Sequence, residues 1–168
     1  MPKTTESHKG LLGEGGGKRS DPLYQAQAIL SRRDHAEAEV RRKLKQKGFA
    51  ESQIEGAVAW LKQHRLLNDE AFARMYVENT LRFKPTGPRL LTLKLRQRGV
   101  ETALIEKVMA ESFTPGRETE LLQQAAQQRR VSSLQEPREY ARLQRWLLSR
   151  GFSPSSVDEY LQRLRRAT

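Results

Sequence analysis

A sequence pattern that recurs three times, around Gly48, Gly99 and Gly151, is the feature that most constrains this chain. The glycines are 51 and 52 residues apart, and each one follows a cation and precedes a hydrophobic residue. Apolar residues lie four and eight positions before each glycine: Leu44 and Val40, Leu95 and Leu91, and Leu147 and Leu143. Self-similarity at a fixed period is the mark of a repeat protein, so the pattern predicts one structural unit used three times.

Each repeated glycine fits the C-terminal cap of a helix. Glycine has no Cβ and therefore adopts positive φ without a clash, which a Schellman cap requires. The cap pairs the next hydrophobic residue with the leucine four positions before the glycine, and the preceding cation complements the helix dipole. A second helix follows, with apolar residues at helical spacing: Ile54, Ala57, Val58 and Leu61; Ile105, Val108 and Met109, with Ser112 as the exception; and Val157, Tyr160, Leu161 and Leu164.

Another helix is expected before each of these corners, at about 22–32, 69–83 and 115–130. Phe72, Tyr76 and Phe83 mark the second of these helices. Prolines stand at the front of apolar-periodic segments and never inside one: Pro22, Pro88, Pro115, Pro137 and Pro154. The residues expected to cap helices are Asp21, Asn68, Gly87, Thr114 and Ser153.

These patterns predict an all-α fold of three tandem three-helix repeats, stacked into an elongated, curved rod. The repeats are expected at 21–66, 67–113 and 114–168, after a flexible, basic, glycine-rich tail at 1–20. Each repeat is too small to bury much apolar surface alone, so neighbours must pack against one another.

Enzyme chemistry finds little support in the sequence. The chain has no cysteine, and His8, His35 and His64 have no second ligand at metal spacing. No nucleophile stands beside a base in a recognisable motif, and no apolar run approaches the length of a membrane span. We therefore expect a soluble, cytoplasmic, monomeric protein that is not an enzyme, with no cofactor, metal site or membrane contact.

Positive charge is the clearest functional signal. Lysine and arginine number 31 against 20 acidic residues, giving a net charge of +11 that is spread over all three repeats. Cations that point away from the apolar stripe of each middle helix are the candidate binding residues: Arg41, Arg42 and Lys45; Arg89 and Arg96; and Arg138, Arg142 and Arg145. Such faces favour a long polyanion or an acidic protein groove.

Four apolar residues need a separate interpretation. Trp60 and Trp146 are expected to pack between helices, since the aromatics are not interleaved with cations as in a base-stacking platform. Leu90 and Leu93 point away from the Leu91/Leu95 stripe, so they are expected to face an adjoining repeat or a partner protein.

Several short motifs resemble bacterial RecX proteins in sequence, spacing and order. The matching segments are Ser31–His35, Glu39–Leu44 and Lys47–Phe49 in the first repeat, Leu66–Asp69, Phe72-Ala73, Tyr76-Val77, Gly87-Pro88 and Leu95–Val100 in the second, and Gln144–Leu147 and Arg150–Phe152 in the third. The chain departs from the family where Pro85, Leu90 and Lys94 replace a usual glycine, arginine and glutamate, although Arg89 supplies a charge beside the second.

The resemblance implies a modulator of the RecA recombinase that acts in recombination, DNA repair and the SOS response. Family members resemble curved helical rods that lie in the groove of the RecA–DNA filament and limit its ATPase, strand-exchange and coprotease activities. The partners expected on this basis are the RecA filament and, without sequence preference, single- and double-stranded DNA. Two alternatives are a helix-turn-helix-like DNA-binding protein that acts without RecA, and a scaffold that binds acidic proteins.

Overall fold

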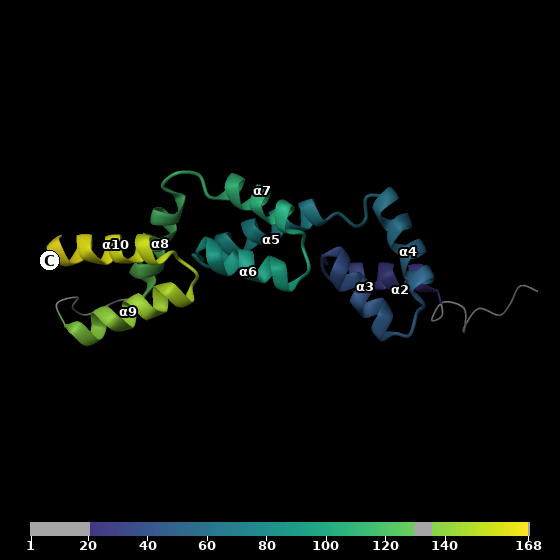
Figure 1. The fold of residues 1–168 in the computed structure, drawn as a ribbon, viewed down its shortest axis with the longest axis horizontal. Helices are drawn as coiled ribbons and strands as arrows, with labels where there is room; N and C mark the ends of the chain where they lie inside the picture. The colour runs from purple at the N-terminus through teal and green to yellow at the C-terminus, as the bar shows by residue number, and fades with distance from the viewer. Residues whose placement is uncertain (1–20, 130–135, 168) are drawn as a thin grey trace, which may run out of the picture. The chain divides into compact units, whose positions relative to one another are not determined.

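The computed structural model describes residues 21–129 and 136–167, and every regular element within them is an α-helix (Figure 1). The all-α prediction is therefore confirmed. The helices are α2 (Pro22–Leu30), α3 (Glu37–Gln46), α4 (Glu51–Gln63), α5 (Asp69–Phe83), α6 (Pro88–Gln97), α7 (Thr102–Ser112), α8 (Arg117–Gln128), α9 (Pro137–Ser149) and α10 (Pro154–Ala167). The expected tail at 1–20 lies outside the described residues, and the boundaries of the three repeats stay predictions.

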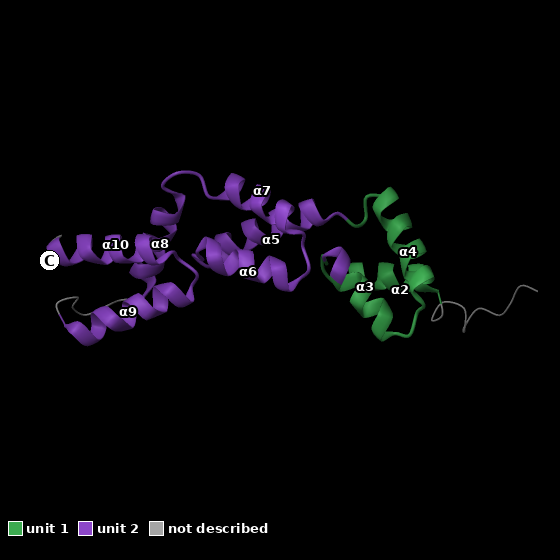
Figure 2. Ribbon diagram, in the orientation of Figure 1, with its two compact units in different colours: residues 1–35, 39–67 green, residues 36–38, 68–168 purple. Residues whose placement is uncertain are grey.

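The described chain divides into two compact units (Figure 2). The first unit comprises residues 21–35 and 39–67, and the second comprises residues 36–38 and 68–167. In the first unit α2 packs on α4, and the apolar stripes of α2, α3 and α4 form one core around Val40, Leu44 and Leu61. The predicted stripes of the first repeat are thus buried together.

The second unit contains two adjoining cores. One is built by α5, α6 and α7 around Leu91, Leu95 and Ile105, and the other by α8, α9 and α10. Leu81 and Phe113 pack against both cores, so six helices form one body.

All three predicted glycine corners are present. Gly48, Gly99 and Gly151 have φ of +88°, +81° and +83°. Each cap has the two expected backbone hydrogen bonds; in the first, the Phe49 N–H donates to the Leu44 carbonyl at 3.3 Å and the Gly48 N–H to the Lys45 carbonyl at 3.0 Å. The expected contact partners share a core in each case: Phe49 with Leu44, Val100 with Leu95, and Phe152 with Leu147.

Helix N-termini follow the sequence signals with one exception. The Asn68 side chain accepts from the N–H groups of Glu70 and Ala71 at 2.9 and 3.0 Å, and the Asp21 side chain caps α2 by accepting from the Leu23 N–H at 2.9 Å. The prediction that Thr114 and Pro115 begin α8 is wrong, because Gly116 precedes this helix with φ of +87° and the helix begins at Arg117. A left-handed glycine turn delays the helix by two residues, so Pro115 lies in the loop.

Within the second unit, the third glycine corner sits directly on the start of α6. The N–H of Gly87 donates to the Arg150 carbonyl at 2.9 Å, and the N–H of Arg89 donates to the Gly151 carbonyl at 3.0 Å. A Cβ on Gly151 would lie 2.3 Å from the Leu90 backbone nitrogen. The expectation that Leu90 faces an adjoining repeat is therefore confirmed, whereas Leu93 is exposed.

The second corner has a similar neighbour. A Cβ on Gly99 would lie 2.4 Å from the Cβ of Ala38, which belongs to the second unit as Gly99 does. The first corner differs, since nothing lies within 4 Å of a Cβ on Gly48. Two of the three caps therefore combine a left-handed turn with a close contact, and one has only the turn.

Candidate polyanion interface

The candidate cations of α3 divide into two kinds. Arg42 and Lys45 are exposed, and no carboxylate partner is found for either among the described residues. Arg41 is different, because its guanidinium donates to the Glu55 carboxylate at 2.7 Å and lies 3.7 Å from Glu51. Arg41 thus neutralises acids of α4 and links the two helices, which makes it a weaker candidate for binding an anion.

On α6, Arg89 and Arg96 both have exposed side chains with no carboxylate partner in the described chain. They stand seven residues apart on one helix and therefore share a face. The backbone of Arg89 is already held by Gly151, which anchors the helix turn that carries its side chain. The side chain itself stays available to an external anion.

The three candidate cations of α9 are also exposed. Arg142 pairs with Glu139 at 3.2 Å, and the Arg145 Nε donates to the Ala141 carbonyl of its own helix at 3.3 Å. An exposed ion pair of this kind contributes little, from about 0 to 1 kcal/mol, so an incoming phosphate displaces it readily. Arg138 has no carboxylate partner in the described residues.

The structure thus places the predicted residues on three helices and leaves six of the eight without a described carboxylate partner. These six are Arg42, Lys45, Arg89, Arg96, Arg138 and Arg145. The cations of α6 and α9 belong to one body, the second unit. In this unit the backbone hydrogen bonds from Gly87 and Arg89 to Arg150 and Gly151 join the start of α6 to the end of α9.

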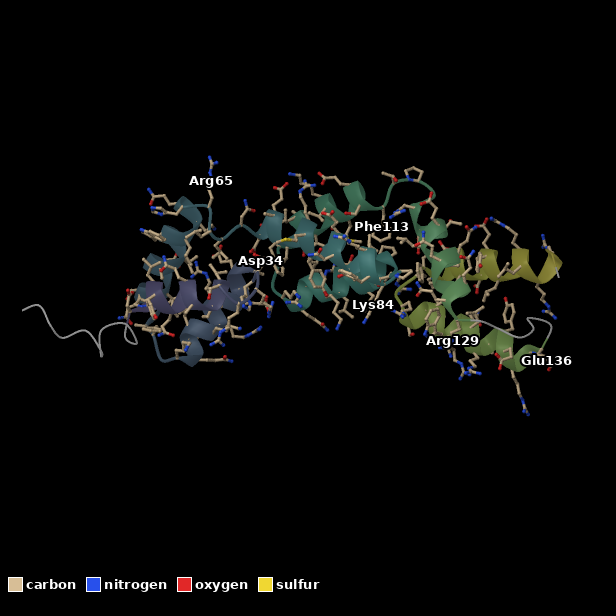
Figure 3. All side chains as sticks on the ribbon, turned by 180° about the vertical axis from the view of Figure 1, so that it is seen from behind. Asp34, Arg65, Lys84, Phe113, Arg129 and Glu136 are labelled. Carbon is tan, nitrogen blue, oxygen red and sulfur yellow. The ribbon has the colours of Figure 1, made fainter. Side chains whose placement is uncertain are left out.

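The cations at the second and third corners have a role beyond the helix dipole. The Arg98 guanidinium lies 4.7 Å from the Tyr76 ring centroid and 5.8 Å from that of Phe72. Arg150 lies 5.0 Å from the Trp146 centroid, and Arg129 (Figure 3) lies 5.1 Å from the same centroid. A cation over an aromatic face is attracted by the ring quadrupole, so these arginines stabilise the fold.

Both tryptophans pack as expected. Trp60 lies against the first core and stacks on His64 at a centroid distance of 3.7 Å. Trp146 lies against the core of α8, α9 and α10. Both rings therefore contribute mainly to packing within their own units.

The sequence interpretation missed a cluster at the end of α5. Phe83, expected to mark the apolar pattern of this helix, is 74% exposed, and the Arg82 guanidinium lies 5.8 Å from its ring centroid. Lys84 follows and is exposed (Figure 3). The run Arg82-Phe83-Lys84 is visible in the sequence, but helical periodicity alone does not show which apolar residue lacks a neighbour.

A mixed-charge groove of about 570 Å³ lies beside α5 and is lined in part by Arg74, Val77, Leu81 and Arg117. Its charges are largely paired: Arg74 binds Glu111 and also Glu70, which accepts from Lys107 at 2.8 Å. Hydrogen bonds from Lys107 and Arg74 lower the pKa of Glu70, and hydrogen bonds to Glu111 and next to Glu70 raise the pKa of Arg74.

One titratable pair is buried in the first unit. The Nδ1 atom of His35 lies 3.5 Å from the Glu39 carboxylate, which also accepts from Arg33 at 3.2 Å. Burial, and next the charge of Arg33, lower the pKa of His35. In residues 21–129 and 136–167 no group of three histidine, cysteine or acidic side chains could hold a metal ion, and no helix is long and apolar enough to cross a bilayer.

Comparison with known proteins identifies the family. Residues 25–61 match the family model described as RecX, first three-helix domain, and residues 68–109 match RecX, second three-helix domain. The regulatory protein RecX of Vibrio parahaemolyticus is 35% identical over 126 residues, which cover 74% of this chain and 79% of the relative. This chain belongs to the RecX family.

Other RecX proteins agree. That of Chlorobaculum tepidum is 32% identical over 144 residues, 85% of this chain and 88% of the relative. That of Caldanaerobacter subterraneus is 32% identical over 133 residues, and there the match spans 65% of the relative's length. These relatives are named regulatory proteins, in agreement with the prediction that the chain is not an enzyme.

Solved structures give the same fold. A crystal structure of regulatory protein RecX is similar with a TM-score of 0.71 and 26% identity, covering 87% of this chain and 72% of that one. RecX from Lactobacillus salivarius is similar with a TM-score of 0.75 and 22% identity, over 90% of this chain and 99% of that one. The resemblance to RecX that the sequence motifs indicate is therefore confirmed.

Proposed function

We propose that this chain is a cytoplasmic regulator of the RecA recombinase that binds the RecA–DNA filament in its groove. The carrying observation is its membership of the RecX family, since matches at 32–35% identity cover most of the chain and of several relatives. The proposed effect is a limitation of ATPase, strand-exchange and coprotease activity. The protein occupies sites along the filament and contributes no chemistry of its own.

The unpaired cations support a filament-bound regulator. Arg96, Arg138 and Arg145 lie on two helices of one body and have no described carboxylate partner. Each cation that neutralises a phosphate releases a counterion, so binding weakens with salt by a slope of about 0.9 per contact on duplex DNA. Such contacts position a protein on a polyanion without reading its sequence.

The deciding experiment measures RecA ATPase and strand exchange on single-stranded DNA with substoichiometric amounts of this chain. We expect both activities to fall, because a protein that blocks filament growth acts on many RecA subunits at once. No change in either activity would contradict the proposal.

A matched pair of variants tests the surface. The triple variant R96Q/R138Q/R145Q removes three unpaired cations, and we expect it to bind filaments more weakly and with a smaller salt slope. The control K107Q/R117Q/R163Q removes the same charge from cations paired with Glu70, Glu120 and Glu159. Equal binding by the two variants would show that the candidate cations are not the interface.

The helix-turn-helix alternative is tested by DNA footprinting without RecA. A sequence-specific footprint would favour that function, since a recognition helix must present several side chains to base edges. The candidate cations are instead distributed over α3, α6 and α9, which favours contacts to phosphate.

A further inference from the structure

Phe83, the last residue of α5, is the most exposed large hydrophobic residue among those that the structure describes. Its residue accessibility is 74%, whereas the other exposed large hydrophobic residues lie between 37% and 52%. A buried ring of this size contributes strongly to a core, and here that contribution is not used. The ring is thus free to be covered by something outside the described chain.

The segment that carries this ring is held firmly. The N–H of Lys84 donates to the Thr80 carbonyl at 2.9 Å, and the Thr86 hydroxyl donates to the Lys84 carbonyl at 2.9 Å. Pro85, Thr86 and Gly87 are all buried, and Gly87 is bonded to Arg150. A ring on a fixed support loses less conformational entropy when a ligand covers it than a ring on a mobile loop.

Cations without carboxylate partners stand on both sides of the ring in the sequence. The Arg82 guanidinium lies 5.8 Å from the ring centroid, and Lys84 is exposed at the next residue. No carboxylate partner is found for Arg82 or Lys84 in the described residues, although Arg74 and Arg117 nearby on the same unit are ion-paired. The cluster Arg82-Phe83-Lys84 therefore has the charge that suits an anionic ligand and an aromatic ring that is 74% exposed.

We propose that Phe83 is a stacking platform for an unpaired base of single-stranded nucleic acid, with Arg82 and Lys84 binding the flanking phosphates. An aromatic face accepts any base, and adjacent cations follow the backbone. A duplex fits less well, because its bases are already stacked on one another. The proposal rests on the proposed function only in that this site would help to hold the DNA of the filament.

Removal of the ring gives the first test. Binding of the full chain to a (dT)20 oligonucleotide is compared with binding to an abasic strand of the same length, which has phosphates but no bases. We expect Phe83→Ala to weaken binding to (dT)20 by about 5- to 150-fold and binding to the abasic strand little. Leu93→Ala, which removes an exposed apolar side chain of α6, is the control and should leave both affinities unchanged.

Removal of the positive charge at Lys84 should have a different effect from removal of the ring. We expect Lys84→Gln to weaken binding to both strands equally and to lower the salt slope by about 0.7, the value for one contact on a single strand. Phe83→Trp should retain binding and show emission quenching by (dT)20 beyond that of the wild type, since Trp60 and Trp146 pack against the cores.

Three results would overturn the assignment. The first is an unchanged affinity of Phe83→Ala for (dT)20, and the second is an equal loss of affinity for (dT)20 and for the abasic strand. The third is a loss of affinity only for RecA protein without DNA, which would make Phe83 a protein contact. Each is distinguishable from failure of the proposed function, because inhibition of RecA ATPase by the wild-type chain is measured separately. Because Phe83 is 74% exposed and belongs to no core, Phe83→Ala should change thermal unfolding little. A marked folding defect would therefore also contradict this description.

Discussion

Alanine substitutions at four glycines separate two contributions to the loss of stability: the strain of a left-handed backbone and the clash of a new Cβ with its neighbours. Gly48→Ala introduces only backbone strain, because φ is +88° and nothing lies within 4 Å of the new Cβ. Gly87→Ala introduces only a clash, because φ is −76° but the Cβ would lie 2.2 Å from the Gly151 carbonyl carbon and the Phe152 nitrogen. Gly151→Ala introduces both costs.

The expected losses in the free energy of unfolding follow from these contacts. A left-handed alanine costs about 1–2 kcal/mol, which is the whole effect expected at Gly48. Forcing a methyl group into packed atoms costs about 1–3 kcal/mol, and backbone neighbours at Gly87 cannot move aside as a side chain can. Gly151→Ala should therefore lose about 2–5 kcal/mol, the sum of the two ranges. Gly99→Ala should fall between Gly48→Ala and Gly151→Ala, because its close neighbour is the Ala38 methyl group.

Urea unfolding followed by tryptophan emission measures these losses unit by unit. Trp146 reports on the second unit in a Trp60→Phe background, and Trp60 reports on the first in a Trp146→Phe background. Because Gly87→Ala and Gly151→Ala open the same junction, the double variant should lose less than the sum of the single losses. A neutral Gly87→Ala, or a Gly48→Ala as costly as Gly151→Ala, would refute the reasoning.

Three further outcomes are expected from the described contacts. Gly56→Ala should stabilise the first unit by about 1 kcal/mol in urea unfolding, since Gly56 lies inside α4 with open space around it. Asn68→Ala should destabilise the second unit by about 1 kcal/mol, because it leaves two helix N–H groups without their acceptor, whereas Asn68→Asp should retain most of the stability. The pKa of His35 is lower in the folded chain than its ordinary value of 6.5, so its contribution is present above pH 6.5 and lost as pH falls through the folded pKa. A pH series should therefore show a stability loss below 6.5 that His35→Gln reduces; identical profiles would contradict the assignment.

Local chemistry explains which parts of the fold could be predicted from the sequence. The corner at Gly48 depends on residues within a few positions of it, and the same is true of the Asn68 cap, so both are visible in the sequence. The sequence signals place the start of α8 two residues too early, because Thr114-Pro115 and Gly116 are competing local signals and the structure has the left-handed turn at Gly116. Such competition is decided by the surrounding packing and not by either motif alone.

Less of the candidate site than of the fold could be predicted from the sequence. The cationic face of α6 follows from helical periodicity, but the pairing of Arg41 with Glu55 joins two helices, and no spacing rule within one helix predicts it. Phe83 has the apolar character of a core residue, and only the arrangement of its neighbours shows that its ring is largely exposed. Exposure and pairing are tertiary properties, so they separate binding cations from structural ones only once the helices are placed.

The backbone hydrogen bonds between the third corner and α6 can also report whether helices α5–α7 and α8–α10 of the second unit stay packed together. Amide protons in the first turn of a helix ordinarily exchange quickly with solvent, because no carbonyl of their own helix accepts them. At the start of α6 the amides of Gly87 and Arg89 are instead bonded to carbonyls more than sixty residues away. Their deuterium uptake should therefore be slow while α5–α7 stay packed against α8–α10. It should rise if binding of a partner separates the two sets of helices.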